Sequence, residues 1–111
     1  MARRRNAMIV CPTDVVRASA ERLWQLVTTP TALARWSDTT VLDAADRELS
    51  PGDRLLLGAG PWRFAKVFLR VEDAVRPRRL ALDIRLPLGI TNREVIEIVP
   101  VDQHSCRVTF N

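Results

Sequence analysis

Apolar and polar side chains alternate with a period of two over most of the second half of the chain. In the clearest segment, 79–86, the apolar positions are Leu80, Leu82, Ile84 and Leu86. Such alternation is typical of antiparallel β-strands that bury one face and expose the other to water. The same reasoning predicts strands in six further segments: 8–17, 39–45, 54–58, 64–73, 91–99 and 106–110.

Helical spacing replaces this alternation between the first predicted strand and the rest. A helix is predicted over 20–28, where Ser19 is a suitable N-cap and Glu21 favours the positive end of the helix dipole. Pro30 ends this helix and suits the entry to a second, 31–36. The order of one strand, two short helices and then about six strands predicts an α+β domain with a curved antiparallel β-sheet of six to seven strands.

Three stretches of the sequence resemble one superfamily. They are 15–27 (VVRASAERLWQLV), 30–38 (PTALARWSD) and the turn 51–53 (PGD). On these stretches, the domain over 8–111 resembles the helix-grip superfamily (SRPBCC), which includes START-like, polyketide cyclase/dehydrase-like and pollen-allergen-like lipid carriers. The resemblance implies a sheet that curls around a long C-terminal helix, with a ligand pocket between the two.

That long C-terminal helix has no counterpart here, because the sequence stops at Phe110-Asn111 in or just after the last predicted strand. We therefore expect a C-terminally truncated helix-grip domain whose two short helices cover only part of the apolar sheet face. Burying a large apolar side chain contributes roughly 1.5–3 kcal/mol, so a bare face predicts a homodimer or a bound ligand. The residues expected on this face are Val67, Leu69, Val71, Leu80, Leu82, Ile84, Leu86, Ile96 and Ile98.

The net charge of +4 raises the question of nucleic-acid binding. Three of the positive charges are adjacent, at Arg3, Arg4 and Arg5, and without them basic and acidic residues are nearly equal in number. Residues 1–7 are accordingly predicted to form a flexible basic N-terminal tail. The rest of the chain is nearly neutral, and we expect no nucleic-acid partner.

The two cysteines, Cys11 and Cys106, lack the neighbouring cysteine or histidine residues that a metal site needs, so no metal and no cofactor are predicted. Two thiols suit a reducing compartment. The apolar run 8–10 is too short for a signal peptide core, and no segment approaches the roughly 20 apolar residues that span a bilayer. We expect a cytoplasmic protein with no membrane span.

Residues suited to catalysis are few. The one histidine, His104, falls in a predicted hairpin turn, and the sequence contains neither GxSxG nor HExxH. Asp14, Asp38 and Asp83 are single carboxylates without an evident partner. Enzymatic activity is therefore left open, and no catalytic residue is assigned.

The inward face of the predicted sheet supplies most of the candidate ligand-binding residues, since pocket walls in this architecture are core positions that lack a neighbour. Aromatic residues near the expected pocket complete the set. The candidates are Trp36, Leu57, Trp62, Phe64, Val67, Leu69, Leu82, Ile84, Ile96 and Ile98. Arg93 and Glu94 begin a strand, and the pattern leaves open which of them faces inward.

Three functions are compatible with this sequence. The first is binding or transport of a hydrophobic small molecule, such as a lipid or a polyketide-like ring. The second is a polyketide cyclase/dehydrase-like enzyme, which a buried acid–base pair in the pocket would favour. The third is a protein-interaction module that dimerises through the apolar sheet face, which a ligand-free dimer sealed through that face would favour.

Overall fold

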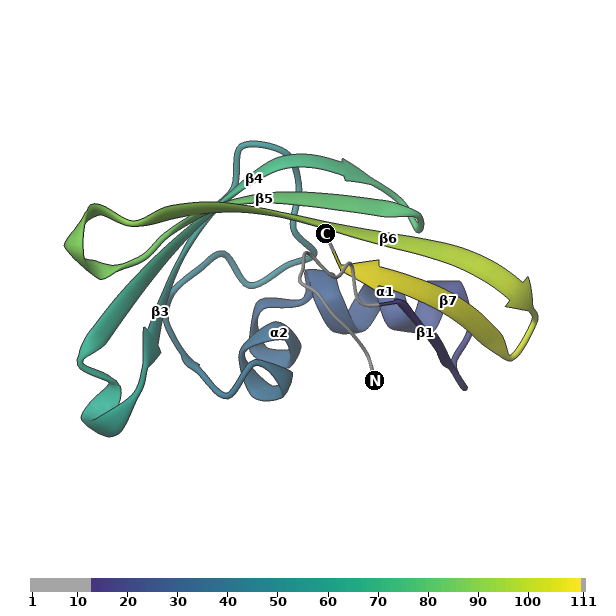
Figure 1. Ribbon diagram of the computed structural model, residues 1–111, viewed down its shortest axis with the longest axis horizontal. Coiled ribbons are helices and arrows are strands. Elements are labelled where there is room, and N and C mark those ends of the chain that lie inside the picture. Colours follow the sequence, from purple (N-terminus) through teal and green to yellow (C-terminus); the bar gives the residue numbers. More distant parts are fainter. Residues whose placement is uncertain (1–12, 111) are drawn as a thin grey trace, which may run out of the picture.

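A curved sheet arches over two short helices in the computed structural model, which describes residues 13–110 (Figure 1). The predicted tail 1–7, the first part of the predicted strand 8–17 and Cys11 lie outside the described residues. The elements are β1 (Thr13–Val16), α1 (Ala20–Thr28), α2 (Pro30–Trp36), β2 (Thr40–Asp43), β3 (Arg54–Ala59), the 3-10 turn η1 (Pro61–Arg63), β4 (Ala65–Val75), β5 (Arg79–Arg85), the 3-10 turn η2 (Pro87–Gly89), β6 (Thr91–Asp102) and β7 (Ser105–Phe110).

All seven described strands form one antiparallel sheet in the order β1-β7-β6-β5-β4-β3-β2. Strands β2 to β7 follow one another as hairpins, and β1 pairs with β7, so Val16 lies opposite Cys106. The register of β4 against β5 shifts between Val71 and Asp73, and a bulge of this kind increases local bending and twist. The predicted α+β class with two helices after the first strand is confirmed, and no helix follows β7 within residues 13–110.

The helix pair is built as its sequence predicts. Ser19 caps α1, since its Oγ accepts a hydrogen bond of 3.1 Å from the backbone N–H of Arg22. Pro30 is the first residue of α2 rather than the residue before it, which its fixed φ and missing N–H permit. Thr29 alone separates the two helices, and both lie beneath the sheet (Figure 1).

The loop before β3 completes the core. Leu49 is only 3% exposed, and its backbone N–H donates to the carbonyl oxygen of Thr28 over 2.8 Å, which ties the loop to the end of α1. Asp53 then holds the following turn by accepting bonds from Ser50 N–H and, with both oxygens, from Arg47 at 2.7 Å each. These bonds lower the pKa of the Asp53 carboxyl, chiefly through the hydrogen bond from Arg47. The loop therefore acts as a third covering element beside the helices.

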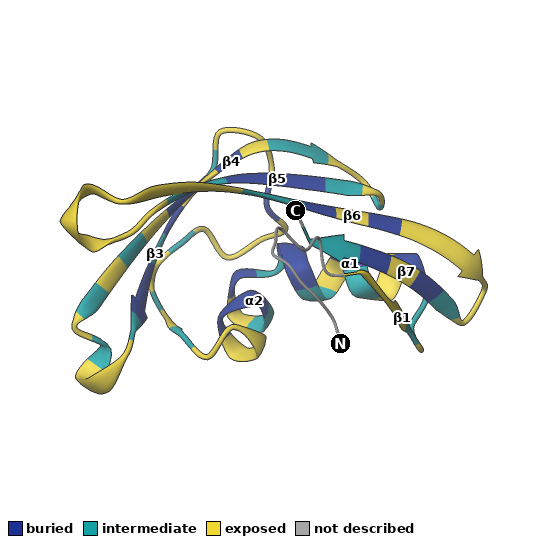
Figure 2. Cartoon of the chain, viewed as in Figure 1, coloured by how far each residue is buried: buried dark blue, intermediate teal, exposed yellow. Residues whose placement is uncertain are grey.

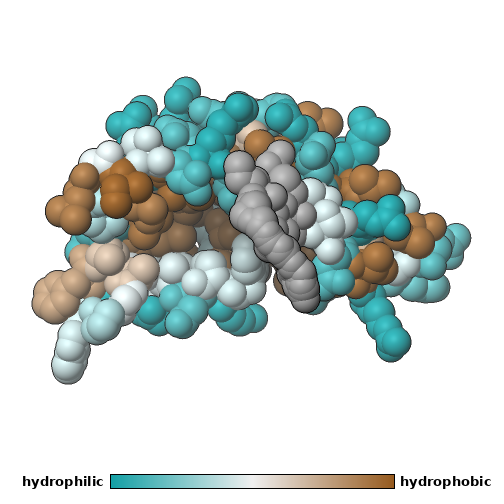
Figure 3. All heavy atoms as spheres, viewed as in Figure 1, coloured by the Kyte–Doolittle hydropathy of each residue, from teal (hydrophilic) through white to brown (hydrophobic). Residues whose placement is uncertain are grey.

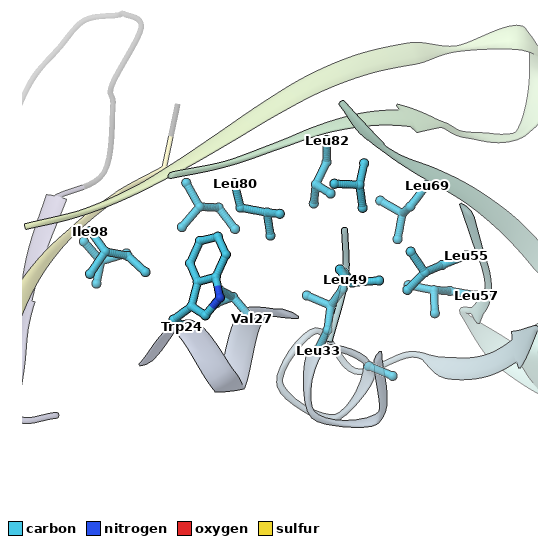
Figure 4. Close-up of a cluster of buried hydrophobic side chains, with 14 of the residues drawn as sticks. Trp24, Val27, Leu33, Leu49, Leu55, Leu57, Leu69, Leu80, Leu82 and Ile98 are labelled. Carbon is cyan, nitrogen blue, oxygen red and sulfur yellow. The ribbon is translucent and has the colours of Figure 1, made fainter. Parts of the chain in front are cut away.

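Trp24 is the centre of the packing between α1 and the sheet. Its side chain is 1% exposed and points from α1 toward Leu80 and Ile98 (Figure 4). Its indole Nε1–H is buried and has no hydrogen-bond acceptor among the described residues. A large ring therefore fills the space under the curve of the sheet at the expense of one unpaired donor.

The two helices cover only part of the apolar face, as expected, but with the loop around Leu49 the covered part is the larger one. Figure 2 shows a continuous buried segment of β5 above the helices, and buried positions that alternate with an exposed one along β6. The buried members of the face are Leu69, Val71, Leu80, Leu82, Ile96 and Ile98. Only Val67 and Ile84 are partly buried, and Leu86 lies beyond the end of β5 and is exposed. The gap in the cover is confined to the end of the sheet near α2.

We expect Trp24 and Trp62 to differ sharply in their effect on stability. Trp24→Ala should lower the free energy of unfolding by about 3–5 kcal/mol, because it leaves a large cavity. Trp24→Phe should cost about 1.5 kcal/mol or less, because most of the ring volume stays and the unpaired N–H is removed. Urea denaturation followed by circular dichroism measures both changes.

Trp62→Ala is the matched control for that comparison. Trp62 is 88% exposed, so its truncation should change the free energy of unfolding by no more than about 0.5 kcal/mol. A cost for Trp62→Ala equal to that for Trp24→Ala would contradict the packing described above.

Candidate ligand-binding pocket

A pocket of about 250 Å³ occupies the place where α2 leaves the sheet uncovered. Its wall is mostly apolar and draws on α2, the segment after α2, and strands β3 to β7. The lining residues are Leu33, Trp36, Ser37, Thr39, Leu57, Val67, Leu69, Leu82, Ile84, Glu94, Ile96 and Phe110. Figure 3 shows apolar side chains gathered around a hollow beneath the sheet, on the left of the view.

The sheet contributes to this wall through directly opposed residues. Leu57 pairs with Val67, Leu69 with Ile84, and Leu82 with Glu94. Because successive residues of a strand point to opposite faces, each of these pairs presents both side chains to the same side. The wall therefore follows directly from the register, and Glu94 stands in it beside apolar neighbours.

Two aromatic rings flank the pocket on the helix side. The centroids of the Trp36 and Phe110 rings lie 6.1 Å apart with an interplanar angle of 59°, a tilted contact within the favourable range for aromatic pairs. Trp36 comes from α2 and Phe110 from the end of β7, so the contact joins the helix pair to the far strand of the pocket. Trp36 remains 50% exposed, which leaves one side of its ring accessible to solvent.

Glu94 is the one ionisable side chain in the pocket wall. Desolvation by burial raises the pKa of its carboxyl. Among the described residues it makes no hydrogen bond and no ion pair, whereas its neighbour Arg93 points to the other face and donates to Glu72 Oε1 at 2.9 Å. The structure thus resolves the facing that the sequence left open: Glu94 is inward and Arg93 outward.

Ser37 and Thr39 are the other polar residues of the wall. The Ser37 hydroxyl donates to the carbonyl oxygen of Leu33 at 2.7 Å, and it lies 3.0 Å from the hydroxyl of Thr39. Both groups close the end of α2, where the chain turns through Asp38 at a positive φ of 56°. Their protons therefore have acceptors within the protein.

A larger hollow of about 510 Å³ lies on the opposite face of the sheet. Its charged lining consists of Arg54, Arg70, Asp83 and Arg85, and Phe68 adds an exposed ring. These residues are on the outward parity of β3, β4 and β5, as alternation predicts. The smaller inner pocket is the better candidate for an apolar ligand, because its wall consists of core residues and the outer hollow is mainly basic.

Seven of the ten predicted ligand-binding residues meet in the inner pocket. They are Trp36, Leu57, Val67, Leu69, Leu82, Ile84 and Ile96. Ile98 lies deeper in the core, near Trp24. Trp62 and Phe64 lie at the turn between β3 and β4, where they are 88% and 78% exposed, and they are not part of the wall.

The prediction omitted five residues of the wall: Leu33, Ser37, Thr39, Glu94 and Phe110. The sequence pattern could have placed Glu94 on the inward face, because Glu94, Ile96 and Ile98 follow one another at a spacing of two residues. Ser37 and Thr39 carried no such signal, since their positions depend on how the chain leaves α2.

Other chemistry is sparse in the described part of the chain. It contains no group of three or more histidine, cysteine or acidic side chains placed to hold a metal ion. His104 is exposed in the β6–β7 turn, and its backbone N–H donates to Asp102 Oδ1 at 2.7 Å. Cys106 is buried under the sheet edge, which raises the pKa of its thiol. No helix over residues 13–110 is long and apolar enough to cross a membrane.

The sequence profile described as "Polyketide cyclase / dehydrase and lipid transport" matches residues 12–111. A search of curated proteins found no match.

Solved structures share the fold at low sequence identity. A protein from Rhodobacter sphaeroides is 20% identical with a TM-score of 0.68, and the match covers 89% of this chain and 68% of that one. A protein from Thermobifida fusca is 29% identical with a TM-score of 0.64 and the same two coverages. DynU16, a protein in the dynemicin biosynthetic locus, is 15% identical with a TM-score of 0.68, and the match covers 92% of this chain and 36% of that one.

The desolvated carboxyl of Glu94 makes a prediction about pH. A carboxyl whose pKa is raised on folding binds its proton more tightly in the folded protein than in the unfolded chain. The stability that this adds is fully present below the unfolded pKa and is lost as pH rises through the folded pKa. Glu94→Gln should therefore be more stable than the parent protein at pH 7, by less than about 1 kcal/mol because water still screens the partly exposed group. Near pH 3, below the ordinary glutamate pKa of about 4.3, the difference should vanish.

Thermal unfolding at the two pH values measures this effect. Glu97→Gln is the control, because Glu97 lies on the same strand but is exposed on the other face. A stabilisation of equal size in Glu97→Gln would show that net charge, and not the pocket, is responsible.

Proposed function

Because this chain belongs to the polyketide cyclase/dehydrase and lipid transport family, we propose that it binds a hydrophobic small molecule in the pocket between α2 and the inner face of the sheet. The observation that supports this proposal most directly is the pocket wall itself. Nine of its twelve residues are apolar, and they are continuous with the core. A ligand that filled the pocket would remove the partly exposed Val67, Ile84 and Trp36 from water.

The size of the pocket limits the ligand. A volume of about 250 Å³ is slightly below the range of roughly 300–1,000 Å³ typical of drug-sized sites. The described pocket accommodates one or two fused rings, or one end of a longer molecule that extends past Trp36 into solvent. A compact ring system is therefore the preferred ligand over a fully enclosed long chain.

The two alternative functions differ from this proposal in what they require. Cyclase/dehydrase-like catalysis would need an acid or base in contact with the ligand, and Glu94 is the one ionisable side chain of the wall. An interaction module would need a second chain seated on Val67, Ile84 and Trp36, and the small uncovered area offers less to such an interface than a bare sheet face would.

An arginine placed in the pocket wall should abolish binding. Ile84→Arg is expected to weaken binding of the neutral dye N-phenyl-1-naphthylamine at least tenfold, because a long charged side chain occupies and hydrates the apolar space. Ile90→Arg is the matched control, since Ile90 is exposed at the β5–β6 turn, outside the pocket wall. The rise in dye fluorescence on binding gives both affinities.

Native mass spectrometry of the purified 111-residue chain completes this test by reporting oligomeric state and any co-purified ligand together. The proposal predicts a monomer that binds the dye with a stoichiometry of one. Equal dye binding by Ile84→Arg and the parent protein would contradict it. A ligand-free dimer that binds dye only after dissociation would favour the interaction module instead.

A further inference from the structure

Apart from the indole N–H of Trp36, the polar side-chain groups of the inner pocket are hydrogen-bond acceptors toward a ligand. The Ser37 hydroxyl donates its proton to the Leu33 carbonyl oxygen, and Thr39 is engaged with Ser37 at 3.0 Å and lies 3.4 Å from the Ala34 carbonyl oxygen. An ionised Glu94 carboxylate has lone pairs and no proton to give. The wall contains no arginine, lysine or histidine, and no side-chain amide.

Glu94 lies in the pocket wall, partly buried and without a partner among the described residues. It lies opposite Leu82 on β5, and two residues before Ile96, where the β6–β7 pairing begins at Phe110. No described residue donates a hydrogen bond to its carboxylate or pairs with it. Asp38, which lies between the wall residues Ser37 and Thr39 in the sequence, is 95% exposed at its side chain and pairs with Arg63 at 3.5 Å, so it does not compete for the pocket.

From this arrangement we propose that Glu94 selects the ligand: the pocket takes a compact apolar ring that carries a hydroxyl group, and the Glu94 carboxylate accepts the hydrogen bond from that hydroxyl. This inference rests on the proposed binding function and adds the ligand class. A desolvated carboxylate that remains unpaired is costly, and a ligand hydroxyl satisfies it with a charge-assisted hydrogen bond. A ligand with no donor leaves that carboxylate unsatisfied in a drier pocket.

The same arrangement excludes ligands with an acidic end. A ligand carboxylate next to Glu94 would place two negative charges together in an apolar wall, with no cationic residue of the pocket to compensate them. Free fatty acids and other anionic ligands are therefore disfavoured in this pocket. Among ligands of equal size, we therefore expect the pocket to prefer the one that carries a hydroxyl group.

Three naphthalenes of nearly equal size provide the test: 2-naphthol, 2-methylnaphthalene and 2-naphthoate. At pH 8, NMR titration of the intact protein is expected to show 2-naphthol binding at least about tenfold more tightly than 2-methylnaphthalene, the factor that one hydrogen bond to a charged group supplies. Binding of 2-naphthoate should be the weakest of the three.

Two variants assign the preference to the carboxylate. Glu94→Leu should reverse it, so that 2-methylnaphthalene binds more tightly than 2-naphthol, because the hydroxyl then enters an apolar site without a partner. Glu94→Gln retains an acceptor oxygen but no charge, so it should reduce the hydroxyl preference and relieve the exclusion of 2-naphthoate. Glu97→Gln, on the exposed side of the same strand, should behave as the parent protein does.

The outcomes separate this inference from the proposed function. If all three naphthalenes bind with the same affinity, the pocket is a binding site and the role of Glu94 is refuted. Binding of 2-naphthol that is unchanged in Glu94→Leu also refutes it. If none of the three binds while the protein is folded, the proposed function and the inference both fail.

Discussion

The contact between the inner face of the curved sheet and the helix pair determines the rest of this structure. Trp24 reaches from α1 to β5 and β6, and the loop that is tied to the end of α1 contributes the buried side chain of Leu49. Together with Leu33 of α2 they bury most of the apolar face without any later helix. This packing fixes how far the sheet can bend over the helices, and hence where uncovered core surface remains.

The pocket is the consequence of that incomplete cover. The helices end with Trp36, and the strands continue beyond it, so Val67 and Ile84 face a space that no described side chain fills. Most of its residues stand in strands β3 to β7, whose register is set by buried neighbours. A binding site made in this way is largely preformed, which lowers the entropy lost when a ligand enters.

Charged side chains have different surroundings on the two faces of the sheet. Outward residues include arginines in ion pairs with acids, such as Arg93 with Glu72, where water screens the charges. The wall of the inner pocket carries a single carboxylate, Glu94, and burial rather than a charged partner raises its pKa. Solved structures at 15–29% identity share this fold.

The sequence by itself determined the α+β class, the strand and helix order, and the inward residues of β4 to β6, because local periodicity encodes which face of each element is buried. Only the tertiary structure decided how much of that face is covered. Leu49 entered the core from a loop with no periodic signal, and Trp62 and Phe64 moved out to an exposed turn. The two-residue spacing of Glu94 from Ile96 indicates its face, but only the pairing with Leu82 shows which side chains surround it, since neighbours across strands depend on register and not on local pattern.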